Sequence, residues 1–242
     1  FPYTTLFRSG GIMLHVYIFH GFKSDSSAMK RFVLFEEEIR EGIAKITGIK
    51  PRSIENCAFY NRTWGVMKKS SKLSYLYNVL FNSETYPLEV HEEWDKAIET
   101  IEDDYSSIIA NRINSMSEND HVLFVGHSMG TYLIAEVIPK IKNDITLNLF
   151  FMGGIVSKNL CELLFDDERI RCVVNLFSRS DVPLERFLEE MSGFFDEPVG
   201  INSIEHKKAI NKGLSISHSG YLEDTEVIDM YRMFVAQLVR YQ

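Results

Sequence analysis

The sequence is poor in cysteine, in basic charge and in long apolar runs, and each shortage excludes a class of protein. Its three cysteines, Cys57, Cys161 and Cys172, are odd in number and widely spaced, which argues against a disulfide framework or a cysteine-based metal site. We expect them to be small buried residues in a reducing compartment, so the predicted location is cytoplasmic. No apolar run approaches the roughly 18 residues that a membrane-spanning helix needs, so no transmembrane segment is predicted.

Acidic residues outnumber basic ones, 34 to 26, which gives a formal net charge of -8. A nucleic-acid surface needs a basic face to displace counterions from phosphates, so nucleic acid is not an expected partner. The length of 242 residues, with 45% hydrophobic and 25% charged content, is ordinary for one globular domain with a large core. These values favour a soluble enzyme without deciding its chemistry.

The first nine residues, FPYTTLFRS, resemble the translation of a common sequencing adapter fused in frame to a gene fragment. We therefore set residues 1–9 aside from the fold prediction and expect a single domain over residues 10–242. In that case the natural N-terminus lies elsewhere, and the absence of a leader or upstream domain carries no information.

From residue 12 onward, short β-like runs alternate with longer stretches of helical periodicity. This alternation predicts an α/β fold, in which a mostly parallel sheet carries helices on both faces. Strands are predicted at residues 12–19, 57–60, 121–125, 145–152, 171–177 and 214–216. Helices are predicted at residues 29–46, from 90 to near 119, 131–138, 160–165, 183–191 and 226–240.

The pentapeptide Gly126-His127-Ser128-Met129-Gly130 lies between an apolar strand-like run and a helix-like stretch. By chance G-x-S-x-G occurs in about one chain of this length in twelve, so its setting must decide its meaning. A strand that ends at the first glycine and a helix that opens at the serine are typical of a nucleophile elbow. Both glycines then have a steric reason, since a Cβ would collide where strand and helix approach. The alternative is a Gly/Ser-rich turn without chemistry.

Two later residues fit the groups that a nucleophilic Ser128 would need. A serine hydroxyl is a poor nucleophile near neutral pH unless a base takes its proton and a carboxylate orients that base. Asp181 lies in the loop after the strand at 171–177, and His218 follows the last predicted strand. The chain order Ser, Asp, His is that of α/β-hydrolases.

Other assignments are possible for these positions. Asp181 could simply cap the helix that follows it. His206 competes with His218 as the base, but the charged segment 205–208 indicates a solvated surface. His127 precedes the nucleophile, so we expect it to point away from the hydroxyl and to pack nearby.

Acyl chemistry also needs donors for the oxyanion of the tetrahedral intermediate. The backbone N–H of Met129, directly after the serine, is the first predicted donor. The second is the N–H of Phe22, which follows the first strand in the segment His20-Gly21-Phe22, where Gly21 lets the backbone bend toward the substrate. The alternative for this segment is an ordinary turn at the end of a strand.

The chain resembles the α/β-hydrolase fold of the serine esterase and lipase superfamily over residues 12–242. The residues that carry the resemblance are His20-Gly21, residues 126–130, Asp181 and His218. Three segments are also similar to a hydrolase-like family that includes transmembrane and coiled-coil domain proteins: residues 174–181, 197–201 and 217–221. The resemblance implies a Ser-Asp-His triad without metal or organic cofactor. The chain departs from the pattern in its opening antiparallel hairpin, which we expect to be reduced or missing.

Residues 61–87 interleave large apolar side chains with lysines, a pattern that fits a lid over an acyl pocket. An amphipathic helix packed on the core is the alternative. The predicted function is that of a serine hydrolase cleaving a small-molecule carboxylic ester or thioester through an acyl-enzyme. An amidase or acyltransferase would use the same residues, and a silent hydrolase-fold binding or scaffold protein is the alternative from another class.

Overall fold

The computed structural model describes residues 5–9, 12–21, 41, 45, 57–58, 88–185 and 197–240. These residues include a seven-stranded sheet of order β1-β2-β4-β5-β6-β7, with β3 also paired to β2. The strands are β1 (Thr5–Ser9), β2 (Ile12–Phe19), β3 (Cys57–Ala58), β4 (His121–His127), β5 (Thr146–Met152), β6 (Ile170–Ser178) and β7 (Ala209–Leu214). Every pairing is parallel except that of β1 with β2.

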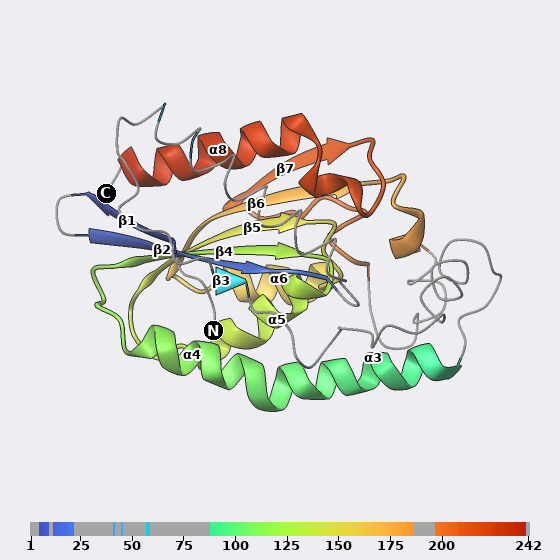
Figure 1. Cartoon of the computed structure of the whole chain (residues 1–242), viewed down its shortest axis with the longest axis horizontal. Coiled ribbons are helices and arrows are strands. Elements are labelled where there is room, and N and C mark those ends of the chain that lie inside the picture. The colour runs from blue at the N-terminus through green and yellow to red at the C-terminus, as the bar shows by residue number, and fades with distance from the viewer. Residues whose placement is uncertain are drawn as a thin grey trace.

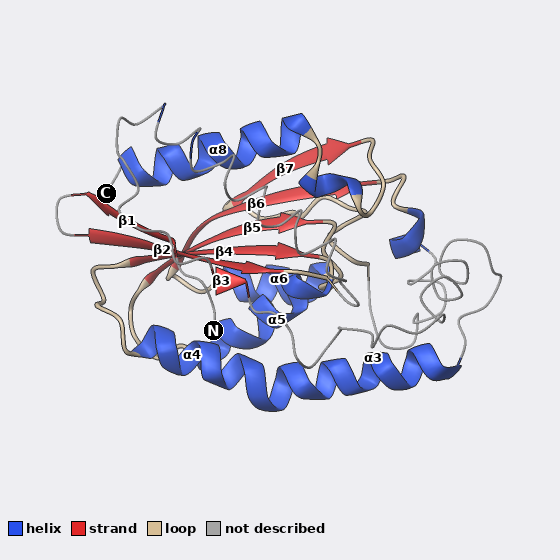
Figure 2. Cartoon of the chain, in the orientation of Figure 1, coloured by secondary structure: helices blue, strands red, loops and turns tan. Residues whose placement is uncertain are grey.

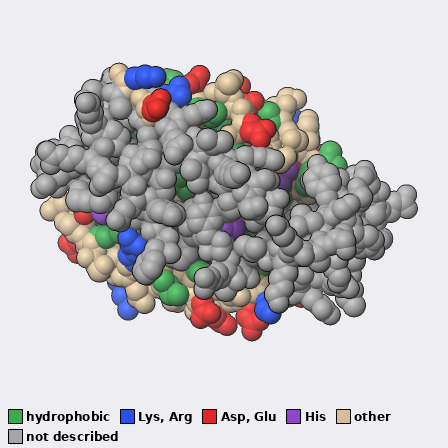
Figure 3. Space-filling model, in the orientation of Figure 1, with side chains coloured by type: hydrophobic (Ala, Val, Ile, Leu, Met, Phe, Trp, Pro, Cys, Tyr) green, Lys and Arg blue, Asp and Glu red, His purple; other side chains and the backbone are tan. Residues whose placement is uncertain are grey.

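Helices cover both faces of the sheet (Figures 1 and 2). The helix α8 (Thr225–Arg240) lies on one face. The other face carries α3 (Leu88–Thr100), a π-helical turn (Ile101–Tyr105), α4 (Ser106–Asn114), α5 (Met129–Val137) and α6 (Lys158–Phe165). Short 3₁₀ turns occupy Ile138–Lys140 and Gly220–Leu222. The long helix from α3 to α4 has an acidic outer face, and the carboxylates along the lower rim of Figure 3 lie over it.

The central strands are buried on both sides, which explains their continuous apolar runs. Along β4, Val122 and Phe124 pack into the core beneath α4 and α5. Leu123 and Val125 point the other way, into the core beneath α8. A mostly parallel sheet between two helical layers is the architecture of the α/β-hydrolase fold, as the sequence predicts.

The opening hairpin is present in a reduced form. Its outer strand is β1, five residues that pair antiparallel with the first half of β2, and β3 pairs with the second half. The residues of β1 belong to the segment set aside above, so that segment contributes an edge to the sheet. The origin of residues 1–9 in an adapter stays a prediction.

Two predicted boundaries are wrong. The last strand is Ala209–Leu214, not residues 214–216, because an edge strand with exposed and polar positions lacks the apolar run that marks a buried strand. The helix before β4 ends at Asn114 rather than near residue 119. Of the predicted helix at 29–46, only Glu41 and Lys45 are described, and both are helical. The predicted lid at 61–87 lies outside the described residues.

An amide buried in the core gives a test of the packing. Asn148 on β5 is almost fully buried, and neither its Nδ2 nor its Oδ1 has a hydrogen-bond partner in the described part of the chain. A buried polar group left unpaired costs about 1–3 kcal/mol. We expect Asn148→Val to raise the free energy of unfolding in urea by an amount of that order. Asn175→Val is the matched control and should lower it, because the Asn175 Nδ2 donates to three acceptors. A loss of stability in both variants would contradict this account.

Candidate active site

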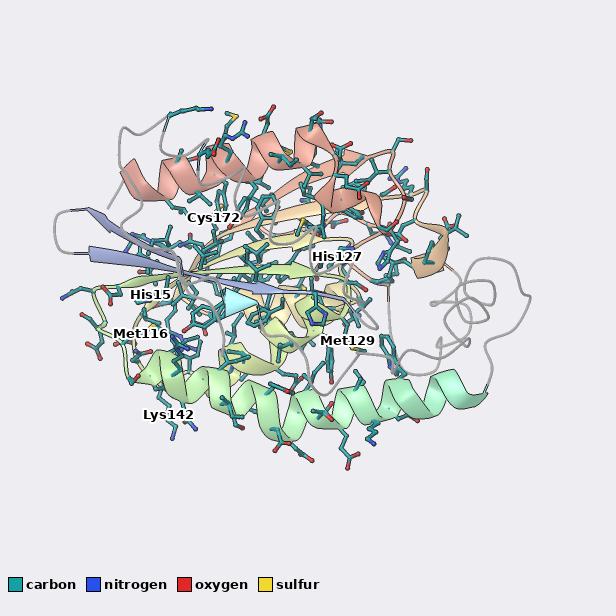
Figure 4. All side chains as sticks on the ribbon, viewed as in Figure 1. His15, Met116, His127, Met129, Lys142 and Cys172 are labelled. Atoms are coloured by element: carbon teal, nitrogen blue, oxygen red, sulfur yellow. The ribbon has the colours of Figure 1, made fainter. Side chains whose placement is uncertain are left out.

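The turn between β4 and α5 holds Ser128 in a strained conformation. Among the described residues, Ser128 is the one non-glycine residue with a positive φ, at φ 53° and ψ -123°. Such conformations cost about 1–3 kcal/mol and persist where the surrounding structure enforces them. Here the Ser128 N–H donates to Met152 O at 3.1 Å, and the Thr131 hydroxyl donates to Ser128 O at 2.7 Å. Figure 4 labels His127 and Met129, which flank the turn.

The glycines on either side of the turn are sites of close approach. A Cβ on Gly126 would lie 2.7 Å from Ile134 Cδ1, and one on Gly130 would lie 2.3 Å from Phe19 O. The predicted steric reason is therefore confirmed for Gly130, where an added Cβ would meet backbone atoms. At Gly126 the nearest atom is the end of a side chain, and the backbone N of Thr131 lies 3.0 Å away. Strand, turn and helix together have the geometry of a nucleophile elbow rather than of a loose polar turn.

The segment that follows β2 lies against the serine. A Cβ on Gly21 would lie 2.9 Å from Ser128 Cβ and 3.3 Å from Ser128 Oγ. The buried His20 donates from Nδ1 to Gly21 O at 2.7 Å, since a carbonyl oxygen only accepts. Backbone of this segment thus lies beside the hydroxyl, where a second oxyanion donor would be needed. Phe22 itself lies outside the described residues, so its N–H as that donor stays a prediction.

Asp181 is completely buried and divides its two oxygens between two partners. Oδ1 accepts from the Leu184 N–H at 3.2 Å, which caps the helical turn that follows. Oδ2 accepts from His218 Nδ1 at 2.8 Å. Both interpretations of this residue, as a cap and as the partner of a histidine, therefore hold at once. With the hydrogen of the neutral ring on Nδ1, His218 Nε2 keeps a lone pair that can take a proton.

The loop after β7 is tied to neighbouring strands by its main chain. The buried Ser178 hydroxyl, at the end of β6, donates to Ile216 O at 2.8 Å. His127 donates from Nε2 to His218 O at 2.8 Å, and the centroids of these two rings are 4.9 Å apart. His127 thus packs nearby, as predicted. These contacts bring the loop that carries His218 to the carboxyl ends of the parallel strands, where Ser128 also lies.

Sequence reasoning missed two residues beneath this site. Gly153, directly after β5, has φ +52°, and a Cβ there would lie 2.8 Å from Tyr221 Cε2 and 3.3 Å from Asp181 Oδ2. Burial and the charge of Asp181 raise the pKa of Tyr221, so its phenol stays neutral. The pair Gly153-Gly154 at the end of a buried strand was the available signal. A side chain at position 153 would therefore collide with the Tyr221 ring and crowd the Asp181 carboxylate that His218 binds.

The structure does not bring every candidate residue into direct contact. Ser128 Oγ makes no hydrogen bond to His218 within the part of the chain that the structure describes. His206 lies before β7 and His218 after it, at opposite ends of that strand. His206 is not solvated as expected, since its ring packs against Phe165 and its Nε2 lies 3.5 Å from Asp166 Oδ1.

The described residues offer little for other kinds of site. No group of histidine, cysteine and acidic residues within them could hold a metal ion. No helix within them is long and apolar enough to cross a membrane. Cys161 is buried and Cys172 half-buried, and burial raises the pKa of both thiols, which disfavours a thiolate nucleophile.

Comparisons with known proteins add little to this geometry. No model of a protein family matches the chain, and no curated protein matches it in sequence. Among solved structures, the chain is similar to acyl-protein thioesterase 2 of Zea mays, with a TM-score of 0.45 and 11% identity over 98% of each chain. At that level of similarity the thioesterase says nothing about the activity of this chain. The narrower resemblance to transmembrane and coiled-coil domain proteins has no support from these comparisons.

Proposed function

We propose that the chain is a serine hydrolase that cleaves a small-molecule carboxylic ester or thioester. In this proposal Ser128 is the nucleophile, His218 the general base and Asp181 the group that orients the imidazole. The backbone N–H groups of Met129 and Phe22 donate hydrogen bonds to the developing oxyanion. The observation that carries the proposal is the hydrogen bond from His218 Nδ1 to Asp181 Oδ2. It lies at the carboxyl ends of the parallel strands, where Ser128 also lies.

The proposed reaction follows from the chemistry of these groups. Ser128 Oγ attacks the carbonyl carbon while His218 Nε2 takes the hydroxyl proton, and the negative Asp181 stabilises the resulting imidazolium. The carbonyl oxygen becomes an oxyanion that the two N–H groups stabilise, each worth about a hundredfold to a thousandfold in rate. The imidazolium then returns its proton to the leaving alcohol or thiol. Water, activated by the same histidine, releases the acid from the acyl-enzyme.

A silent hydrolase-fold binding protein is the second candidate. It is favoured by one observation, that Ser128 Oγ and His218 are not hydrogen-bonded to each other in the described part of the chain. Catalytic hydrogen bonds are often long before a substrate binds, so this contact alone does not decide between the two candidates. They differ in whether Ser128 reacts covalently.

Labelling with a fluorophosphonate probe separates them. We expect the wild-type chain to gain the mass of one adduct, and Ser128→Ala to gain none. Ser128→Gly is a second test variant, because glycine adopts the positive φ of this position without strain. Ser115→Ala, at an exposed serine directly after the last residue of α4, is the matched control and should label like the wild type. Labelling of a folded Ser128→Gly variant would exclude Ser128 as the nucleophile, and an unlabelled but folded wild type would favour the binding protein.

A further inference from the structure

We propose that His127 is a positioning residue that fixes the place of His218 relative to Ser128, an inference that rests on the proposed function. His127 precedes the nucleophile directly in the chain. Its Nε2 donates to the main-chain oxygen of His218, 91 residues later, at 2.8 Å. The two rings also pack, with centroids 4.9 Å apart and planes inclined by 38°. One peptide bond and one hydrogen bond therefore connect the proposed nucleophile to the backbone of the proposed base.

The chemistry of His127 suits this role. A carbonyl oxygen only accepts, so Nε2 carries the hydrogen of the His127 ring. Burial, and secondly the charge of the neighbouring His218, lower the pKa of His127 to about 3. The ring is therefore neutral near pH 7 and keeps this tautomer. When His218 becomes an imidazolium during the reaction, His127 adds no second positive charge beside it.

The position of the His218 ring depends on anchors at both of its ends. The side chain is partly open to solvent, at 19% exposure, and Asp181 holds only its Nδ1 edge. That bond lets the ring swing about Asp181 unless the main chain is also held. His127 holds the main chain at residue 218, and Ser178 holds it two residues earlier through Ile216 O. A displacement of about 1 Å at reacting groups can cost about a hundredfold in rate, so the His127 bond has a kinetic consequence.

Two substitutions separate the hydrogen bond from the packing. His127→Phe keeps a flat ring of similar size but loses the donor, whereas His127→Gln loses the ring and keeps an N–H donor. With 4-nitrophenyl acetate as the probe substrate, we expect His127→Phe to lower kcat by about 10- to 100-fold with KM changed less than about threefold. His127→Gln should recover most of that loss. Rates are taken per active site titrated with the fluorophosphonate probe.

His206→Phe is the matched control. His206 is also a largely buried histidine, with its ring against Phe165 and its Nε2 near Asp166, but it lies at the other end of β7. Its replacement should leave kcat unchanged per titrated site. If His127→Phe and His127→Gln lower kcat equally, or neither lowers it, the positioning role is wrong.

A second measurement does not depend on activity. Hydrogen–deuterium exchange of a peptide covering residues 215–220 reports on the loop, which contains the bond from the Gly220 N–H to Ser217 O. We expect exchange to be about tenfold faster in His127→Phe, and close to wild type in His127→Gln and His206→Phe. If the wild type neither labels nor turns over substrate, the proposed function fails while this result still stands. Equal exchange in all four proteins overturns the anchoring of the loop by His127 in either case.

Discussion

Replacing Asp181 by asparagine is expected to lower kcat by about a thousandfold to ten-thousandfold while leaving the fold intact. The Oδ1 of asparagine can still accept the Leu184 N–H, so the cap of the helical turn is kept. The other atom becomes an NH₂ group and faces His218 Nδ1, which must then accept. The hydrogen of the neutral ring moves to Nε2, and the ring can no longer take the proton of Ser128. Turnover and urea unfolding, measured on the same preparation, test both halves of this prediction.

Asp224→Asn is the control that shares the capping role alone. Asp224 Oδ1 accepts from the N–H groups of Glu226 at 2.9 Å and Val227 at 3.1 Å at the start of α8. No histidine faces it among the contacts that the structure describes. Its asparagine variant should keep the activity of the wild type. Undiminished turnover in Asp181→Asn would show that another group orients the base, and equal losses in both variants would point to a general effect of capping.

The strands and helices could largely be predicted because their signals are local. The bounds of β2 agree with the prediction, and β5 and β6 agree within one residue at each end. Their apolar runs are continuous because both faces are covered. The edge strand β7 could not be located, because it is not fully buried at any position and includes the exposed Asn211 and the half-buried Lys212. An edge strand pairs with one neighbouring strand only, and a single sequence does not show which strand that is.

The candidate site was predictable where chain order carries the information. Ser128 has a local signal in its two flanking glycines, and Asp181 and His218 follow strands in the order that the chemistry needs. The structure places the last two within a hydrogen bond of each other, and their catalytic roles remain the proposal above. The contact between His127 and His218 could not be predicted, since it joins positions 91 residues apart and depends on how one loop packs.

The second large effect expected is on stability, from Gly130→Ala. Glycine in a helix is less favourable than alanine by about 1 kcal/mol, so helix propensity alone predicts a gain. The added Cβ, however, would lie 2.3 Å from Phe19 O and 2.7 Å from Phe19 C, which are backbone atoms of β2. Phe19 is paired with Gly126 of β4 inside the parallel sheet, so neither strand can yield without breaking ladder bonds. We expect the clash to prevail and to lower the free energy of unfolding by about 3 kcal/mol or more.

Gly213→Ala is the matched control, because its Cβ would meet only the rim of the Phe177 ring, at 3.2 Å, on the edge strand β7. A side chain can turn aside where a backbone carbonyl cannot, so this variant should lie within about 1 kcal/mol of the wild type. Urea unfolding measures both. Fluorophosphonate labelling of the folded fraction adds a second readout. Displacing the start of α5 would move the Met129 N–H, the proposed oxyanion donor, and should slow labelling in Gly130→Ala alone. A Gly130→Ala variant as stable as the wild type would show that β2 and α5 can separate at no cost, and the steric reason for the second glycine of the elbow would be lost.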